Sequence, residues 1–180
     1  MSAYDPATVY SSIDRGGRYA YGNQPAIAQW NLARFAETLL PLFDEEMERA
    51  VSFATDVLKD FPARLEAFWL AGMRRKLGLT TDEEGDDALV RSLLDWMQKT
   101  ESDFTNTFRA LSQDDPLTAV RNQNAEFQAW HARWQERLSR SGQPLDSARA
   151  LMRSVNPAVI PRNHRVEEAR AAAARQDDVS

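Results

Sequence analysis

Apolar residues recur at intervals of three and four positions along most of this chain, and that spacing limits what it can fold into. The spacing matches the 3.6-residue turn of an α-helix and gathers the apolar side chains on one face. The sequence contains no neighbouring segments of strict apolar–polar alternation, no internal repeat of fixed length and no low-complexity tract. It therefore predicts an all-α fold, a multi-helix bundle behind an irregular N-terminal loop.

Proline, glycine and short polar residues divide this pattern into segments. Pro25 suits the first turn of a helix, and Pro41 is expected to close that helix. Gly78 and Gly142 suit the position just after a helix ends. We expect an irregular segment over 1–24 and a helical domain over 25–180. The helices expected within it are 25–40, 44–58, 61–77, 89–97, 104–111, 127–138, 148–155 and 166–173. Asp44 is expected to cap the second helix, and Ser102 or Asp103 the fifth. Asp114-Asp115-Pro116 is expected to interrupt the helical pattern after the fifth helix.

The first of these helices is apolar on nearly every side. Its apolar positions are Ile27, Trp30, Leu32, Phe35, Ala36, Leu39 and Leu40. A helix of this kind is usually central in a bundle, so we expect neighbours all around it. The Trp and Phe residues of segment 127–138 are expected in the core.

Composition excludes several functional classes. A length of 180 residues suits one domain, which can bury about 70% of the surface that its unfolded chain exposes. The net charge of −5 argues against nucleic acid and anionic membranes as partners. The absence of cysteine excludes disulfides, zinc thiolate sites, iron–sulfur clusters and thiol catalysis. No apolar run approaches the roughly 20 residues of a membrane span, and no signal core is visible, so we expect a cytoplasmic protein.

Motifs that would carry chemistry are missing from the sequence. It has neither of the common glycine-rich phosphate-binding patterns nor a G-x-S-x-G elbow. His131 lies on an apolar helix face, and we expect a hydrogen-bonded packing residue there rather than a metal ligand. The acidic run Asp82, Glu83, Glu84, Asp86 and Asp87 lacks the spacing of a calcium loop and is expected to be a solvated loop. We therefore assign no catalytic, metal-binding or cofactor-binding residue to this chain.

Four blocks of the sequence resemble one known family. They are "YDPATVYSSIDRGGRYAYGNQPAIAQWNLARFAETLLPL" at 4–42, "MRRKLGL" at 73–79, "DFTNTFRALS" at 103–112 and "MRSVNPAVIPRNHRVEEA" at 152–169. They follow one another as in the selenoprotein O family, whose members are protein adenylyltransferases with a pseudokinase fold. The resemblance extends over nearly the whole chain.

This resemblance implies transfer of AMP from ATP to hydroxyl side chains of proteins, with magnesium as the metal. In that family the nucleotide-binding, metal-binding and catalytic residues precede the 4–42 block. We therefore expect the C-terminal helical part of a kinase-like C-lobe, inactive alone, which is a gene fragment, a split-gene product or a trimmed chain. Its expected partners are the missing N-terminal nucleotide-binding half and the protein substrate. The alternative is a stand-alone helical protein-interaction module without catalysis.

The resemblance also suggests a place for the N-terminal loop. It follows the family's metal-binding aspartate, where a kinase has its activation segment. The candidates for contacts near a substrate are Asp14, Arg18, Tyr19, Tyr21, Asn23 and Gln24. A structural role is slightly favoured over contact with a substrate. In that structural role the same residues fasten the loop to the first helix by hydrogen bonds.

Two further expectations concern surfaces. Arg162, Asn163, His164, Arg165 and Glu167 are expected to form a buried polar network that holds the last helix on the bundle, in preference to a ligand site. An apolar surface around Tyr4 to Tyr21 and the helix face near Ile27 and Trp30 is expected to lack cover. The consequence would be disorder of residues 1–22, self-association, or collapse of the loop onto that face.

Overall fold

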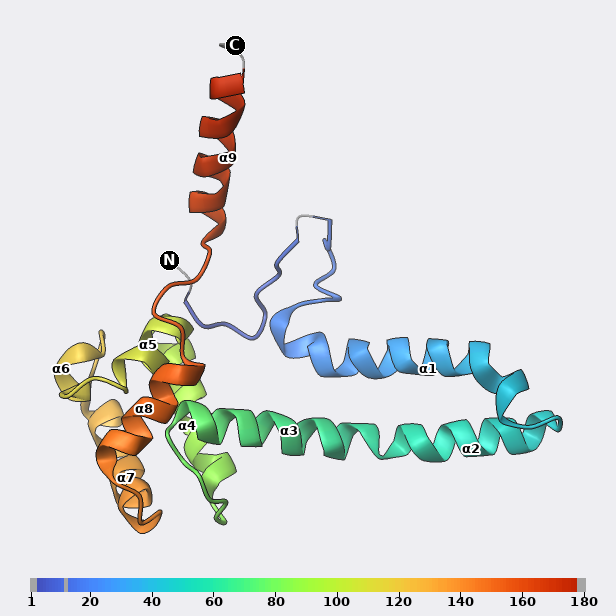
Figure 1. Cartoon of the computed structure of the whole chain (residues 1–180), viewed down its shortest axis with the longest axis horizontal. Helices are drawn as coiled ribbons and strands as arrows, with labels where there is room; N and C mark the ends of the chain where they lie inside the picture. The colour runs from blue at the N-terminus through green and yellow to red at the C-terminus, as the bar shows by residue number, and fades with distance from the viewer. Residues whose placement is uncertain (1–2, 12, 178–180) are drawn as a thin grey trace.

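The computed structural model describes residues 3–11 and 13–177, and the regular secondary structure within them is helical (Figure 1). In that part of the chain no strand is present, and one isolated antiparallel bridge joins Ala3 to Asp103. The all-α prediction is confirmed. The elements in chain order are the 3₁₀ turn η1 (Tyr21–Asn23), α1 (Gln24–Phe43), α2 (Met47–Lys59), α3 (Phe61–Lys76), α4 (Asp86–Lys99), α5 (Phe104–Ala110), α6 (Pro116–Ala119), α7 (Ala125–Arg140), α8 (Leu145–Val155) and α9 (Asn163–Asp177).

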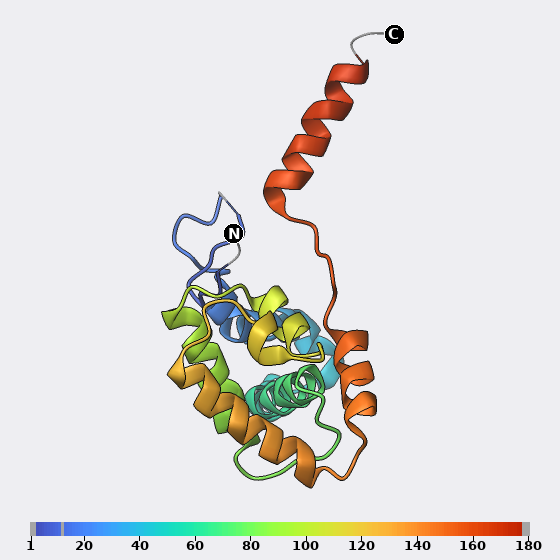
Figure 2. The ribbon, with the colours of Figure 1, turned by 90° about the vertical axis from the view of Figure 1, so that its left-hand side faces the viewer.

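The helices form a compact unit with two extensions. Helices α4 to α8 gather around the C-terminal end of α3, as Figures 1 and 2 show. Helix α2 runs on into α3 as an almost continuous rod, and α1 lies alongside that rod. Helix α9 rises from the top of the compact unit in Figure 1, away from these helices. We call α1, α2 and the N-terminal half of α3 the arm.

The core lies in the compact unit and is built on aromatic residues. Trp96, Phe127, Trp130 and Trp134 are buried together, with ring centroids 4.7 to 5.8 Å apart between successive pairs. Each indole N–H is also satisfied, because Trp130 donates to the Leu89 carbonyl at 2.8 Å and Trp134 donates to the Leu77 carbonyl at 2.9 Å. Trp96 donates to the Asn124 side chain at 3.0 Å. The predicted aromatic core is therefore confirmed, and its polar atoms fix how α4 and α7 pack.

Helix ends follow the predicted glycine and capping signals. Gly78 has a φ of +76°, and the N–H groups of Gly78 and Leu79 donate back to the carbonyls of Arg75 and Arg74 at 3.0 and 2.9 Å. This is the glycine-terminated ending expected for α3. Asp103 caps α5 by accepting from the Asn106 N–H at 2.8 Å. Gly142, with a φ of +67°, follows the end of α7.

Several local expectations were wrong. Helix α1 continues through Pro41 to Phe43, because a proline near the C-terminal end removes only one late backbone hydrogen bond. Helix α2 begins at Met47, and Asp44 binds the Glu46 N–H and Arg49 instead of capping. The short helix α6 was missed, since the Asp115-Pro116 pair that was expected to break the pattern starts a helical turn.

The position of α1 differs most from expectation. We expected it at the centre of the bundle, but it contains no buried residue and packs mainly on α2, on α3 and on the turn η1 that precedes it. Its apolar pattern is real, yet several of its large apolar side chains stay exposed in the part of the chain that the structure describes. The pattern shows that a helix needs neighbours, but it does not show that this chain supplies them.

The expected buried network at the C-terminal helix was also wrong. Arg165 and Glu167 are exposed and pair within α9, with Glu168 at 2.8 Å and Arg170 at 3.1 Å. Arg162 pairs with Asp103 at 2.8 Å, just before α9 begins. The side chains of Asn163 and His164 lie outside the described part of the chain. Because α9 projects from the bundle, its polar groups face solvent and pair with their own helix.

Candidate functional site

The N-terminal loop is held by its own side chains. The Asp14 carboxylate accepts from the backbone N–H groups of Arg18 and Tyr19, both at 2.8 Å. Asn23 donates to the Gly17 carbonyl at 2.8 Å, and Gln24 donates to the Tyr19 carbonyl at 2.6 Å. Three of the six candidate residues thus fasten the loop to itself and to the start of α1.

The other three candidates divide into two groups. The Tyr21 ring packs between Tyr4 and Phe104, with centroid distances of 5.9 and 6.5 Å, and burial raises its pKa. The Arg18 guanidinium instead lies over the Trp30 ring, 4.3 Å from its centroid, and within 5.7 Å of the Tyr19 ring. Arg18 and Tyr19 are exposed. Asn23 and Gln24 are exposed as well, but their amides bind carbonyls of the loop, so Arg18 and Tyr19 are the two whose exposed side chains are not used to fasten it.

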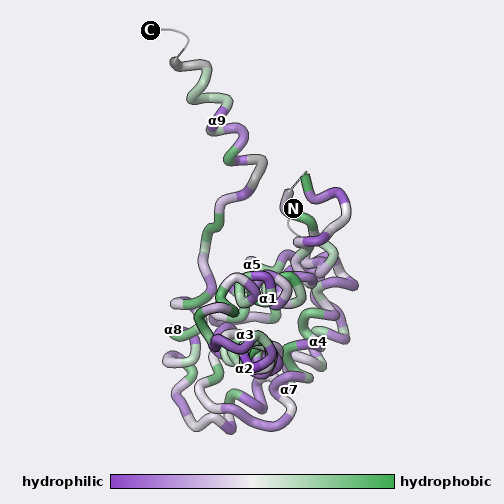
Figure 3. The backbone as a smooth tube through the Cα atoms, turned by 90° about the vertical axis from the view of Figure 1, so that its right-hand side faces the viewer, coloured by the Kyte–Doolittle hydropathy of each residue, from purple (hydrophilic) through white to green (hydrophobic). Residues whose placement is uncertain are grey.

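The arm exposes many large apolar side chains, which together we call the open face. They are Trp30, Leu32, Phe35, Leu42, Phe43, Met47, Val51, Phe53, Val57 and Phe68. Figure 3 looks toward the outer end of the arm and shows α1 and α2 lying beside each other there. In α4 to α8, by contrast, only Leu145 is a large apolar residue with comparable exposure. The uncovered surface expected near Trp30, which is 47% exposed, is thus present and extends along α1 and α2.

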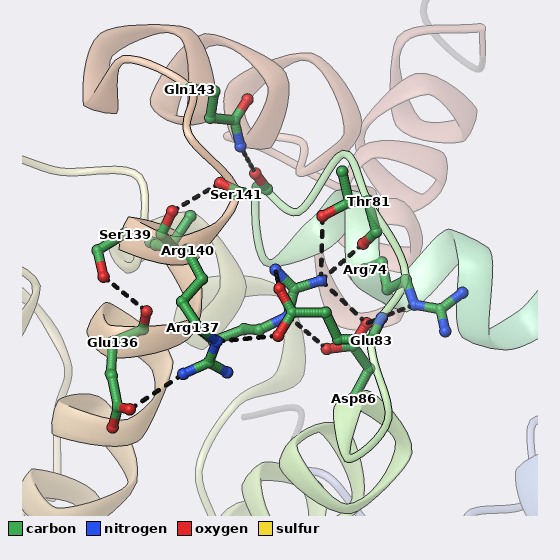
Figure 4. A network of polar contacts seen from close by, with 12 residues as sticks. Arg74, Thr81, Glu83, Asp86, Glu136, Arg137, Ser139, Arg140, Ser141 and Gln143 are labelled. Carbon is green, nitrogen blue, oxygen red and sulfur yellow. Dashed lines mark hydrogen bonds and ion pairs between the residues drawn. The ribbon is translucent and has the colours of Figure 1, made fainter.

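A second polar cluster is buried between α3, α4 and α7 (Figure 4). Asp86 is 1% exposed, and its carboxylate accepts from Arg137 and Arg74, each at 2.7 Å, and from the Glu83 N–H at 3.0 Å. Arg137 is 3% exposed and also donates to the Thr81 carbonyl at 2.7 Å. Glu83 joins the cluster through Arg137 and Arg140, both at 2.9 Å. The cluster therefore ties the 77–85 connection to α7.

This cluster corrects the expectation of a solvated acidic loop. Asp86 and Glu83 belong to a paired network, and only their neighbours on the outside remain solvated. Burial by itself would raise the pKa of Asp86, but hydrogen bonds from Arg137, the Glu83 N–H and Arg74 together lower it below the ordinary value. Two arginines facing one carboxylate satisfy its charge without a metal, so we assign this cluster a structural role.

His131 packs in the core as expected, with its ring 5.3 Å from Trp134 and 6.1 Å from Phe127. Its Nε2 atom is buried without a hydrogen-bond partner, which differs from the hydrogen-bonded histidine that we expected. Burial lowers the pKa of His131, against a weaker opposite effect of Asp115. Across residues 3–11 and 13–177, no group of three His, Cys, Asp or Glu side chains is arranged to hold a metal ion. None of the helices in those ranges has the length and apolarity to cross a membrane.

Comparison with known proteins decides the family. The model of the family described as protein adenylyltransferase SelO matches residues 1–180. The chain belongs to the SelO family. The chain is 54% identical over 180 residues to a protein named protein nucleotidyltransferase YdiU from Shouchella clausii. Proteins of the same name from Brevibacillus brevis and Alcanivorax borkumensis are 53% and 52% identical over 178 and 180 residues.

The SelO relatives are much longer than the matched region. The match includes 100%, 99% and 100% of this chain but only 37%, 36% and 37% of the three relatives. The chain therefore spans little more than a third of the length of these relatives. The resemblance found in the four sequence blocks is confirmed, and the activity of the whole SelO protein comes to this chain only as a proposal.

Sequence analysis named Asp86 and Asp103 but did not predict their partners distant in the chain. Asp103 was expected to cap a helix, and it does, but it also pairs with Arg162, 59 residues later. Asp86 pairs with Arg137, 51 residues later. Nothing in the local sequence identifies these distant partners. The one signal available in the sequence was the position of each aspartate at the start of an apolar helix.

Proposed function

We propose that this chain is the C-terminal helical part of a protein adenylyltransferase, which works only when joined to the nucleotide-binding part of the enzyme. The observation that carries the proposal is the SelO family match, which includes the whole chain but little more than a third of its relatives. Its role is to complete a kinase-like C-lobe and to hold the N-terminal loop beside the catalytic residues that the other part supplies.

The open face of the arm supports this role. Burial of apolar surface contributes about 25 cal/mol for each Å² removed from water. Covering the exposed apolar side chains of α1 and α2 with another polypeptide would therefore stabilise the assembly. Exposed apolar patches beyond a few hundred Å² usually mark an interaction surface. The compact unit covers its own core, whereas the arm does not. We propose that the nucleotide-binding part of the enzyme packs on the open face.

The nucleotide and its metal do not fit the residues of this chain. The described residues offer no triad of metal ligands, and the sequence has no phosphate-binding loop. ATP and magnesium therefore belong to the other part in this proposal, and no step of AMP transfer is assigned to a residue here. We expect the isolated chain to be inactive.

The loop supplies contacts to the protein substrate in this proposal. Arg18 and Tyr19 are the two candidates, because their side chains are exposed while Asp14, Asn23 and Gln24 hold the backbone beneath them. Replacing Arg18 and Tyr19 by alanine should lower transfer to a protein acceptor without changing ATP binding. Replacing Asp14 should weaken both loop order and transfer.

A chimaera tests the proposal directly. Residues 1–180 would replace the matching 37% of the Shouchella clausii relative, and incorporation of labelled AMP into a protein acceptor would be compared with the unaltered relative. At about half of all positions the two sequences agree, so the exchange is expected to preserve activity within about tenfold. A folded chimaera that binds ATP but transfers no AMP would contradict the proposal.

A stand-alone interaction module remains the second candidate. It is favoured by the compact unit, which buries its own apolar core without another polypeptide. Such a module would offer the open face to an unrelated protein. The chimaera separates the two, because a module that has lost its fit to the catalytic part would not restore transfer.

A further inference from the structure

Two segments project from the same side of the compact unit. One is the N-terminal loop, residues 3–11 and 13–20, and the other is α9 together with the linker 157–162. Figures 1 and 2 show both rising on that side. We call them the two jaws.

One residue, Asp103, lies at the root of both jaws, with its backbone beside the loop and its carboxylate beside the start of α9. Asp103 forms the backbone bridge with Ala3, and the neighbouring Ser102 carbonyl accepts from the Tyr4 N–H at 2.8 Å. The same Asp103 side chain caps α5 and pairs with Arg162 at 2.8 Å, one residue before α9 begins. Both partners of this ion pair are mostly shielded from solvent. Both jaws are therefore attached at the start of α5.

The α9 jaw is fixed at both ends of its linker. Asn156 is buried and exchanges hydrogen bonds with Lys76, donating to the backbone carbonyl at 2.9 Å and accepting from the ammonium at 3.1 Å. Arg109 adds a bond to the Asn156 carbonyl at 3.0 Å. Prolines 157 and 161 restrict the backbone between Asn156 and Arg162. Specific contacts therefore hold both ends of the linker that leads into α9.

Each jaw carries uncovered apolar side chains. An apolar groove of about 690 Å³ runs along α9 and its linker, lined by Val159, Ile160, Pro161, Val166 and Ala169. Val159 is 86% exposed. On the loop, Val9, Tyr10 and Ile13 are exposed, Ile13 at 89%. A helix that projects into water with an apolar groove beside it gains little stability from its own chain, so the groove is built for another segment.

We propose that the two jaws form a clamp that receives the nucleotide-binding part of the same enzyme, in addition to its contact with the open face. This inference rests on the proposed function. The occupant is argued from the unmatched length, since about 63% of the Shouchella clausii relative lies outside the match. A second copy of this chain is the other occupant to test.

Hydrogen exchange measures the clamp in both states. In the isolated chain, the α9 amides should exchange rapidly because that helix packs little against the other described helices. In the chimaera with the Shouchella clausii relative, residues 158–173 and 6–20 should both exchange at least tenfold more slowly. If the chimaera does not fold, the same comparison is made between the full-length relative and its own matching segment.

Matched variants identify the contacts. Val159→Asp with Val166→Asp in the chimaera should abolish the protection of α9. Leu145→Asp makes the same kind of change on the exposed side of the compact unit and should leave the protection intact. Asp103→Asn keeps an oxygen for the α5 cap but loses the charge that holds Arg162, so it should reduce the protection of α9 and leave that of the loop, which is attached by backbone contacts.

The outcomes separate this inference from the proposed function. A chimaera that transfers AMP while α9 exchanges as fast as in the isolated chain overturns the clamp and leaves the function standing. Protection of α9 that appears in the isolated chain and rises with its concentration assigns the groove to a second copy and also overturns the proposal. Loss of AMP transfer with the jaws protected contradicts the function alone.

Discussion

At the scale of single residues, long-range charge pairing organises this chain more than its acidic sequence suggests. Asp86 occurs in a run of five acids within six positions, which resembles a solvated loop. Its partners Arg74 and Arg137 come from α3 and α7, and burial turns one member of the run into a structural carboxylate. Local sequence could not indicate this, because the partners are set by tertiary packing.

Removing the charge of Asp86 should be costly. Asp86→Asn leaves Arg137 buried with an incomplete counter-charge, and breaking a buried pair in this way typically costs about 3–5 kcal/mol. Asp87→Asn, one position on, removes an exposed pair with Arg91 and should cost no more than about 1 kcal/mol. Urea denaturation of the two variants measures the difference. Equal free energies of unfolding would show that the cluster is not structural.

The same carboxylate predicts acid sensitivity. Because the folded-state pKa of Asp86 is lowered, its contribution to stability is complete above the ordinary value of about 4 and is lost as pH falls below it. The denaturation midpoint of the parent chain should therefore fall more steeply below pH 4 than that of Asp86→Asn. Parallel curves for the two proteins would contradict this assignment.

His131 predicts a separate dependence at higher pH. Its folded-state pKa is lowered from about 6.5, so the unfolded chain takes up a proton first and stability falls as pH drops below about 6.5. The charged neighbour that opposes this effect is Asp115. His131→Leu should flatten the stability profile between pH 7.5 and 5.5. An unchanged slope would mean that the imidazole is protonated without cost in the fold.

At the scale of elements, the sequence predicts most helices well because their ends carry local signals. Gly78, Gly142 and Asp103 terminate or cap helices by interactions among residues close in sequence. The place of α1 could not be predicted in the same way. Its apolar residues, such as Leu32 and Phe35, specify burial, but the sequence does not state which polypeptide provides it.

The two helix-ending glycines give a matched pair of variants. Gly78→Ala places a Cβ 3.1 Å from the Ala148 carbonyl oxygen, in a left-handed conformation with φ of +76°. Gly142→Ala has similar strain at φ of +67° but meets nothing within 4 Å. Gly142→Ala should cost about 1–2 kcal/mol and Gly78→Ala distinctly more, because α3 must also shift from α8. Thermal unfolding compares them, and equal losses would show that the α3–α8 contact is not tight.

Residues of the open face should behave unlike residues of the core. Phe35→Ser on α1 should change the stability of the isolated chain by no more than about 0.5 kcal/mol, since the side chain is exposed. Phe127→Ala in α7 should cost about 3–5 kcal/mol, because that ring is fully buried among the tryptophans. A large loss of stability for Phe35→Ser would place α1 inside the chain's own core.

At the scale of the whole molecule, the compact unit buries its own apolar side chains, whereas the arm and the two jaws leave large apolar side chains exposed. An isolated chain with this surface should self-associate through the open face. Light scattering should show an apparent mass that rises with concentration, and Phe35→Ser combined with Leu42→Ser should return it toward the monomer. A monomer at every concentration, with the open face intact, would favour a self-sufficient interaction module.

The central proposal is that this chain of the SelO family contributes to AMP transfer only with the rest of the enzyme. The most direct test incubates the purified isolated chain with magnesium and ATP labelled at the α-phosphate, together with a protein acceptor and with the chimaera assayed in parallel. The account predicts labelled acceptor from the chimaera, and neither labelled acceptor nor saturable micromolar ATP binding from the chain alone. Labelled acceptor from the chain alone would contradict the account.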